Sequence, residues 1–114
     1  MSLPQNRPVT QDEIEREIIR LSAMLEEETE NYAVLIEDHA KKEARHKSAW
    51  ARAYLRSEGA VKERESWAEY KMADSLFEMK IAEALAKAKR EKLTSLRTSL
   101  DSLRTLAANL RVQV

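Results

Sequence analysis

Apolar residues repeat along the second half of the chain with the spacing of a coiled coil. From Val61 to Val114, a register that steps alternately by three and four residues is apolar at 13 of its 16 positions. The polar exceptions are Glu65, Ser75 and Lys89. A repeat sustained over this length predicts a long helix whose seam packs against another helix.

The first half carries the same repeat less regularly. Its apolar seam consists of Ile14, Ile18, Leu21, Leu25, Tyr32 and Leu35. The same register then meets the polar residues His39, Lys42 and His46. Beyond Leu35 we therefore expect the contact face to drift to a wider apolar spacing through Ile36, Ala40, Ala44, Ala51 and Leu55.

Local signals predict where the helices begin and end. Thr10 and Glu13 have the spacing of a capping box, which predicts a helix start. Gly59 is the only glycine in the chain and predicts the stop. We expect helix one at about 11–57, a turn at 58–60 and helix two at about 61–112. Residues 1–9, which hold both prolines, are expected to form an extended or disordered arm.

Two long helices joined by a short turn predict an all-α fold, a long antiparallel helical hairpin of coiled-coil type. Folding back at Gly59 places residues 14–25 against residues 93–103, which are the strongest apolar stretches. Charge favours the same pairing, because the acidic run 26–30 then lies beside the basic run 87–92. The net charge is zero, with 20 basic and 20 acidic residues, yet the two signs are segregated along the chain.

Helix two carries a second apolar stripe, which includes Ala84 and Ala88 beside its larger residues. A helix with one partner needs only one seam, so a second stripe indicates another partner. We expect the hairpins to assemble into a homo-oligomeric helical bundle. The expected oligomer interface comprises Tyr70, Phe77, Ile81, Leu96, Leu100 and Leu103.

Composition narrows the possible functions. The chain of 114 residues is short enough for one domain, and the lack of cysteine excludes disulfides and thiol catalysis. No apolar run reaches the length of about 20 residues that spans a membrane. We expect a cytoplasmic protein. No catalytic triad, phosphate-binding loop or carboxylate pair can be argued, so we expect no enzyme, cofactor or small-molecule substrate.

Basic and aromatic residues gather near the predicted turn. Cations that track phosphates, with flat rings that stack on bases, are typical of single-stranded nucleic acid binding. The candidate contacts are Lys41, Lys42, Arg45, Lys47, Trp50, Arg52, Tyr54, Arg56, Lys62 and Arg64. An alternative is that Trp50 and Trp67 fill the apex of the hairpin while the cations form its solvated surface.

A metal site is a third possibility. Glu43 and His46 form a Glu-x-x-His pair, the spacing that places two ligands on one helix face in di-iron bundles. Such a centre needs a second motif and further carboxylates, and the chain supplies one motif. A surface pair is the simpler interpretation.

The stretch from Tyr32 to Val114 resembles the UvsY type of phage recombination mediator. The resemblance lies in a first helix rich in lysine and alanine that ends in Tyr54, Leu55 and Gly59, a restart at Tyr70 and Lys71, and a long terminal helix. It implies a homo-oligomer, found in the host cytoplasm, that binds single-stranded DNA and helps to load a RecA-like recombinase. It places DNA contacts on Lys41, Lys42, Arg45, Lys47 and Arg52.

These observations favour a non-catalytic recombination accessory protein that binds single-stranded DNA and a recombinase as a homo-oligomer. The main alternative is a structural or adaptor coiled coil that binds only protein, in an assembly or scaffold role. The two differ in whether the basic, aromatic region near the turn holds nucleic acid.

Overall fold

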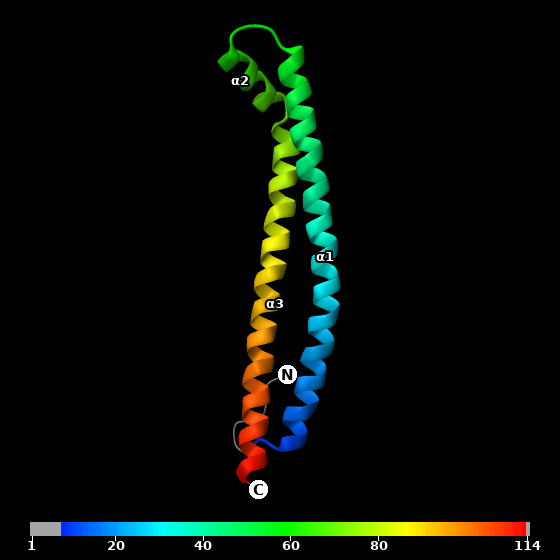
Figure 1. The fold of residues 1–114 in the computed structure, drawn as a ribbon, viewed down its shortest axis with the longest axis vertical. Coiled ribbons are helices and arrows are strands. Elements are labelled where there is room, and N and C mark those ends of the chain that lie inside the picture. Colours follow the sequence, from blue (N-terminus) through cyan, green and yellow to red (C-terminus); the bar gives the residue numbers. More distant parts are fainter. Residues whose placement is uncertain (1–7, 114) are drawn as a thin grey trace. The chain divides into compact units, whose positions relative to one another are not determined.

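The computed structural model describes residues 8–113 and consists of three helices in that range (Figure 1). Helix α1 spans Gln11–Arg56, α2 spans Val61–Lys71 and α3 spans Ala73–Gln113. The predicted all-α helical hairpin is confirmed. Of the predicted N-terminal arm, residues 1–7 lie outside the described part of the chain.

The start of α1 is fixed by the capping box that its sequence predicts. The Glu13 amide donates to Thr10 Oγ1 at 3.2 Å, and the Thr10 amide donates to Glu13 Oε2 at 3.1 Å. Each side chain thereby satisfies a backbone donor that has no partner inside the helix. The first helical residue, Gln11, is the one expected from the sequence.

The chain reverses between Arg56 and Val61. Ser57 closes α1 by donating through its amide and its hydroxyl to the Tyr54 carbonyl, at 3.2 and 2.7 Å. Gly59 has φ of 110°, the only positive φ among the described residues. Glycine is favoured there because it has no Cβ to clash in this region.

The second half of the hairpin is divided at Met72, where the sequence predicts one continuous helix. Met72 has φ −104° and ψ 17°, outside the helical region. The hydroxyl of Ser75 donates to the Met72 carbonyl at 3.0 Å. The Met72 amide still donates to the Ala68 carbonyl at 2.9 Å and the Leu76 amide to the Met72 carbonyl at 3.0 Å, so the change of direction at Met72 keeps hydrogen bonds on both sides of it.

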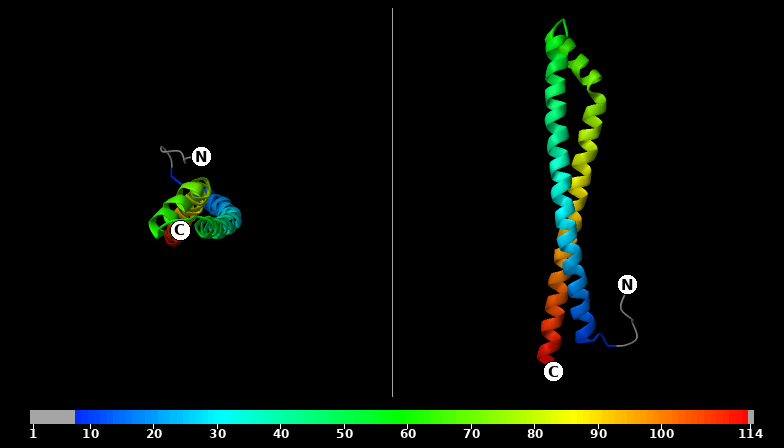
Figure 2. Two further views of the ribbon diagram at one scale, coloured as in Figure 1. Left: turned by 90° about the horizontal axis from the view of Figure 1, so that it is seen from above. Right: turned by 90° about the vertical axis from the view of Figure 1, so that its right-hand side faces the viewer.

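The chain forms two compact units, each of which pairs a segment of α1 with an antiparallel segment of α3 (Figures 1 and 2). Unit 1 contains the residues up to Glu30 together with those from Arg90 onward. Unit 2 contains Asn31–Lys89, which includes the turn and α2.

Unit 1 has a core of leucines that joins the two apolar stretches paired by the sequence analysis. Leu21, Leu96 and Leu100 are buried together, with Ile18 and Leu103 among the residues packed against them. Beside this core, Lys92 Nζ donates to Glu28 at 3.2 Å, in agreement with the predicted pairing of the acidic and basic runs. Because Leu96, Leu100 and Leu103 pack inside the hairpin, their assignment to the oligomer interface is wrong.

In unit 2 the seam on α3 is as predicted and the seam on α1 is not. The buried residues on the α2 and α3 side are Ala68, Met79, Ala82 and Ala86. On α1 the expected drift is wrong, because the register continues through half-buried polar residues: His39, Lys42 and His46. The small residues of the drifted face, among them Ala40 and Ala44, are exposed instead.

Two of the three polar residues of this seam, Lys42 and His46, have hydrogen-bond partners. His46 Nδ1 lies 2.7 Å from Ser75 Oγ on α3. Lys42 Nζ donates to Asp38 at 3.0 Å along α1. A half-buried polar side chain is tolerated when its hydrogen bonds are made, so the seam keeps its 3.5-residue register without apolar residues.

Candidate nucleic-acid interface

The aromatic residues near the turn form two pairs along their own helices. Trp50 and Tyr54 stack with ring centroids 5.6 Å apart and planes inclined by 12°. Trp67 and Tyr70 on α2 are tilted, with centroids 6.0 Å apart. Trp67 is 45% exposed, whereas its neighbour Ala68 is fully buried. Trp67 is therefore partly exposed and does not fill the apex of the hairpin.

Two cations lie over these rings. The Arg64 guanidinium carbon is 5.9 Å from the centroid of Tyr54, and Lys71 Nζ is 5.0 Å from the centroid of Trp67. Both contacts fall within the range of cation–π attraction. Arg64 is half-buried by its contact, so it is less accessible to a ligand than the exposed cations nearby.

Three of the predicted DNA contacts are already paired with a carboxylate one helical turn earlier. Lys41 pairs with Glu37 at 3.0 Å, Lys42 with Asp38 at 3.0 Å and Lys47 with Glu43 at 3.1 Å. Such pairs contribute little stability at an exposed surface, but they cancel the positive field that would attract a phosphate. These lysines are weaker candidates than the sequence indicates.

Four other predicted contacts have no ion-pair partner within residues 8–113. They are Arg45, Arg52, Arg56 and Lys62, and all four are exposed. Their charge is not cancelled locally.

Arg52 and Arg56 line a groove between the end of α1 and α2, which we call the cationic groove. It holds about 330 Å³ and is lined by Ala49, Arg52, Ala53, Arg56, Trp67, Lys71 and Met72. Three of these side chains are cations and none is a carboxylate. The structure therefore brings together Arg52 and Arg56 from the predicted set and adds Trp67 and Lys71, which lie one turn apart on α2.

Lys71 was missed by the sequence reasoning, although a signal for it exists. It follows Trp67 by four residues, and residues at this spacing are neighbours on a helix surface. A lysine one turn after a tryptophan is a candidate cation–π pair, and here the pair forms one wall of the groove.

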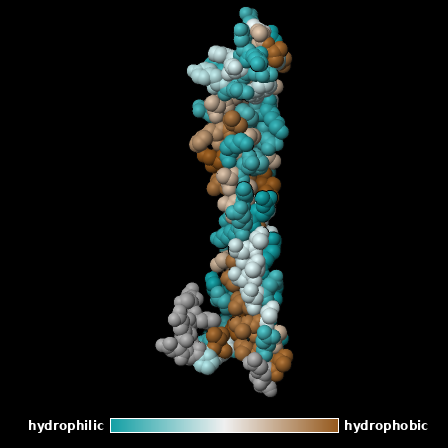
Figure 3. Space-filling model, turned by 90° about the vertical axis from the view of Figure 1, so that its left-hand side faces the viewer, coloured by the Kyte–Doolittle hydropathy of each residue, from teal (hydrophilic) through white to brown (hydrophobic). Residues whose placement is uncertain are grey.

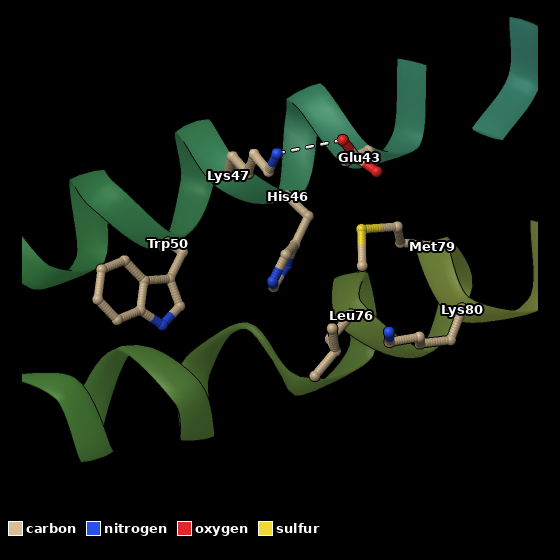
Figure 4. A pocket seen from close by; sticks show the side chains of 7 residues that line it. All are labelled: Glu43, His46, Lys47, Trp50, Leu76, Met79 and Lys80. Carbon is tan, nitrogen blue, oxygen red and sulfur yellow. Dashed lines mark hydrogen bonds and ion pairs between the residues drawn. The ribbon is translucent and has the colours of Figure 1, made fainter. Parts of the chain in front are cut away.

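A second groove in unit 2, the His46 groove, lies between α1 and α3 (Figure 4). It holds about 540 Å³ and is lined by Glu43, His46, Lys47, Trp50, Leu76, Met79 and Lys80. In Figure 4 the imidazole of His46 points from α1 toward α3, and Glu43 turns along α1 to Lys47. The hydrogen bond from Lys47 holds the pKa of Glu43 below its ordinary value.

The geometry of Glu43 and His46 does not assemble a metal centre. Glu43 pairs with Lys47, and His46 bonds to Ser75 across the hairpin. Among residues 8–113, no three His, Cys, Asp or Glu side chains lie close enough together to hold a metal ion.

The outer surface of α3 in unit 2 is apolar, as the second stripe predicts. On α3, Phe77 is 66% exposed and Ile81 44%, and Tyr70 near the end of α2 is 74% exposed. Figure 3 shows hydrophobic side chains gathered on this side of the molecule. Residues 8–113 contain no helix that is both long and apolar enough to cross a lipid bilayer.

Comparisons of the chain with models of known protein families, with curated proteins and with solved structures find no match.

Proposed function

We propose that this protein is a non-catalytic accessory protein of phage-type DNA recombination that binds single-stranded DNA through its cationic groove. The observation that carries the proposal is the lining of that groove, which combines Arg52, Arg56 and Lys71 with the exposed indole of Trp67 and lacks a carboxylate. Cations beside an aromatic ring are the arrangement that holds single strands without sequence preference.

Three cations around one concave surface repel one another, and no carboxylate in the lining offsets the repulsion. A phosphate group bound there relieves it, and the release of counterions from the strand adds to the affinity. The ring of Trp67 offers a surface on which a base can stack, a contact worth about 1–3 kcal/mol.

The test is a salt titration of binding to a fluorescent single-stranded oligonucleotide. We expect Arg52→Gln combined with Arg56→Gln to weaken binding and to reduce the slope of log affinity against log salt by about 1.4, or about 0.7 for each lost phosphate contact. Trp67→Ala should weaken binding with little change in the salt slope, because stacking releases no counterions.

The matched control is Lys41→Gln combined with Lys47→Gln, which removes the same formal charge from lysines that are already paired with acids. We expect a smaller loss of affinity and a smaller change of slope. Binding that is undetectable at low salt, or equal losses in the two double variants, would contradict the proposal.

The proposed function includes a homo-oligomer and a partner recombinase of the RecA type. The exposed stripe on α3 supports the oligomer, since an apolar surface of this kind is disfavoured in water. Light scattering should give a mass above the monomer mass of 13.2 kDa at micromolar concentration. The recombinase comes from the family resemblance, and co-sedimentation of this protein with recombinase filaments on single-stranded DNA would test it.

The second candidate function is a structural or adaptor coiled coil that binds only protein. The same exposed residues favour it: Phe77 and Ile81 offer a helix-binding surface that needs no nucleic acid. The oligonucleotide titration separates the two functions. An oligomer without measurable affinity for single strands would support the adaptor and contradict the recombination function.

A further inference from the structure

Unit 2 carries two unpartnered apolar stripes on opposite outer surfaces. The first, the α3 stripe, consists of Phe77, Ile81, Ala84 and Ala88, with Leu85 beside it, and all of these residues are exposed. The second, the α1 stripe, consists of Ala33, Ile36, Ala40, Ala44, Ala51 and Leu55, which are also exposed, and the exposed Lys47 interrupts it between Ala44 and Ala51. The α3 stripe contains the large side chains of Phe77 and Ile81, and four of the six residues of the α1 stripe are alanines.

The two stripes point away from each other because of the helical repeat. Phe77 and Ile81 are each two residues from the buried Met79, which places them about 200° round α3 from the side that faces α1. Ala40 and Ala44 are each two residues from the half-buried Lys42, so they lie on the far side of α1. The hairpin cannot bring its own two stripes together.

The contact between His46 and Ser75 sets which residues of the two stripes are level. Two residues before His46 is Ala44, and two residues after Ser75 is Phe77, so these two lie at the same height of the antiparallel pair. Ala40, four residues before Ala44, is level in the same way with Ile81, four residues after Phe77. Phe77 and Ile81 are thus each level with an alanine of the α1 stripe, whereas Leu85 is level with Ile36.

We propose that copies of this chain associate side by side in the same orientation, with the α3 stripe of one copy packed on the α1 stripe of the next. Phe77 and Ile81 then lie over Ala44 and Ala40 of the neighbouring copy, whose small side chains leave room for them. This inference rests on the homo-oligomer proposed above and specifies its interface. Because the two surfaces differ, the association is heterologous and continues to an open ribbon or a closed ring.

Charge supports the same arrangement. Glu43 and Lys80 line the His46 groove on one side of unit 2. Arg45, two residues after Glu43, and Glu78, two residues before Lys80, lie on the other side. Neither Arg45 nor Glu78 has an ion-pair partner among the residues that the structure describes. When copies lie side by side, Arg45 of one copy comes within about one helical turn of Glu78 of its neighbour, so opposite charges meet at the edge of the interface.

The experiment blocks one of the two stripes at a time with a charged substitution in the full chain. Ala44→Glu places a charge in the α1 stripe and Phe77→Glu places one in the α3 stripe. Both positions are exposed, so circular dichroism should report unchanged helix content. Each variant alone should be a monomer by light scattering, with association weakened on the order of a hundredfold, because each block leaves a charge facing an apolar surface.

An equimolar mixture of the two variants gives the decisive result. The Ala44→Glu chain keeps its α3 stripe and the Phe77→Glu chain keeps its α1 stripe, so the mixture should form a dimer with one chain of each kind. A chain that carries both substitutions should join neither variant. In a charge test, Arg45→Glu should weaken the wild-type oligomer, and Glu78→Arg in the same chain should restore it.

The results that would overturn this inference differ from the results that would overturn the proposed function. An Ala44→Glu variant that still oligomerises while Phe77→Glu does not would overturn this inference in favour of α3 stripes that pair with each other, and the homo-oligomer would stand. A mixture that remains monomeric would overturn the heterologous interface. A wild-type monomer would overturn both. Oligonucleotide binding by monomeric variants is a separate readout, because the cationic groove lies outside both stripes.

Discussion

Single residues decide how the chain reverses and which polar groups the hairpin admits. Gly59 adopts a backbone conformation that other residues rarely take, and Ser57 satisfies the end of α1. In the seam, Ser75 Oγ lies 2.7 Å from His46 Nδ1 on α1 and 3.0 Å from the Met72 carbonyl oxygen. This chain of two hydrogen bonds links α1 to the break between α2 and α3.

Replacing Gly59 by alanine should destabilise the turn by about 1–2 kcal/mol, since a left-handed conformation is costly for a residue with Cβ. The added Cβ would also collide with the Glu63 carboxylate. The free energy of unfolding from urea titration measures the effect. In the Glu63→Ala background the collision is gone but the backbone strain remains, so a smaller loss should persist. An unchanged free energy of unfolding in Gly59→Ala would contradict this account of the turn.

Helical elements follow from the sequence wherever apolar residues define one face. The seam of α3 was predictable because its buried positions, such as Leu93 and Leu100, are large and regularly spaced. The seam of α1 beyond Leu35 was not, because its alanines are apolar enough to resemble a contact face. Its true contacts, His46 among them, are polar and depend on Ser75 in a distant part of the sequence. Pairwise hydrogen bonds of this kind leave no periodic signal.

Replacing Leu100 tests the leucine core of unit 1. It is 1% exposed, and Leu100→Ala should lower the free energy of unfolding by about 2–5 kcal/mol through lost burial and the cavity that remains. Leu106→Ala is the matched control, because Leu106 is 40% exposed and its loss should cost less than about 1 kcal/mol. Equal effects of the two variants would mean that Leu100 does not lie in the hairpin core.

For the candidate site, the sequence pointed to the region near the turn, and the structure distinguishes the cations that line the groove from those that pair with acids. Arg52 and Arg56 line the cationic groove, whereas Lys41 and Lys47 pair with acids on their own helix. The pairing could have been noticed from the four-residue spacing of Glu37 and Lys41. The groove itself could not, because its second wall is α2, whose separation from α3 at Met72 the sequence does not mark.

At the scale of the whole molecule, the two units differ in what their cores contain. Unit 1 buries Ile14, Leu21, Leu93, Leu96 and Leu100, whereas the buried residues of unit 2 are Met79 and three alanines. Burial of a large aliphatic side chain contributes about 1.5–3 kcal/mol, and an alanine contributes much less. Unit 1 is therefore expected to be the more stable unit, with unit 2 more easily opened.

Hydrogen exchange measured along the chain should report this difference. Amides of residues 93–107 should exchange more slowly than those of α2, where Ala68 is the only fully buried residue. Leu100→Ala should accelerate exchange in unit 1 and leave the order of opening within unit 2 unchanged. Protection of α2 equal to that of the leucine core would contradict the prediction.

The bond between His46 and Ser75 also selects one alignment of the helices among several. The seam of α3 in unit 2 has alanines at 82 and 86, so a slip by seven residues would place His46 opposite Ala82 with little change in apolar contact. Such a slip would leave the imidazole without its partner, at a cost of about 1–3 kcal/mol. The cross-helix bond between His46 and Ser75 thus disfavours slipped pairings, as a polar residue at a seam position does in coiled coils.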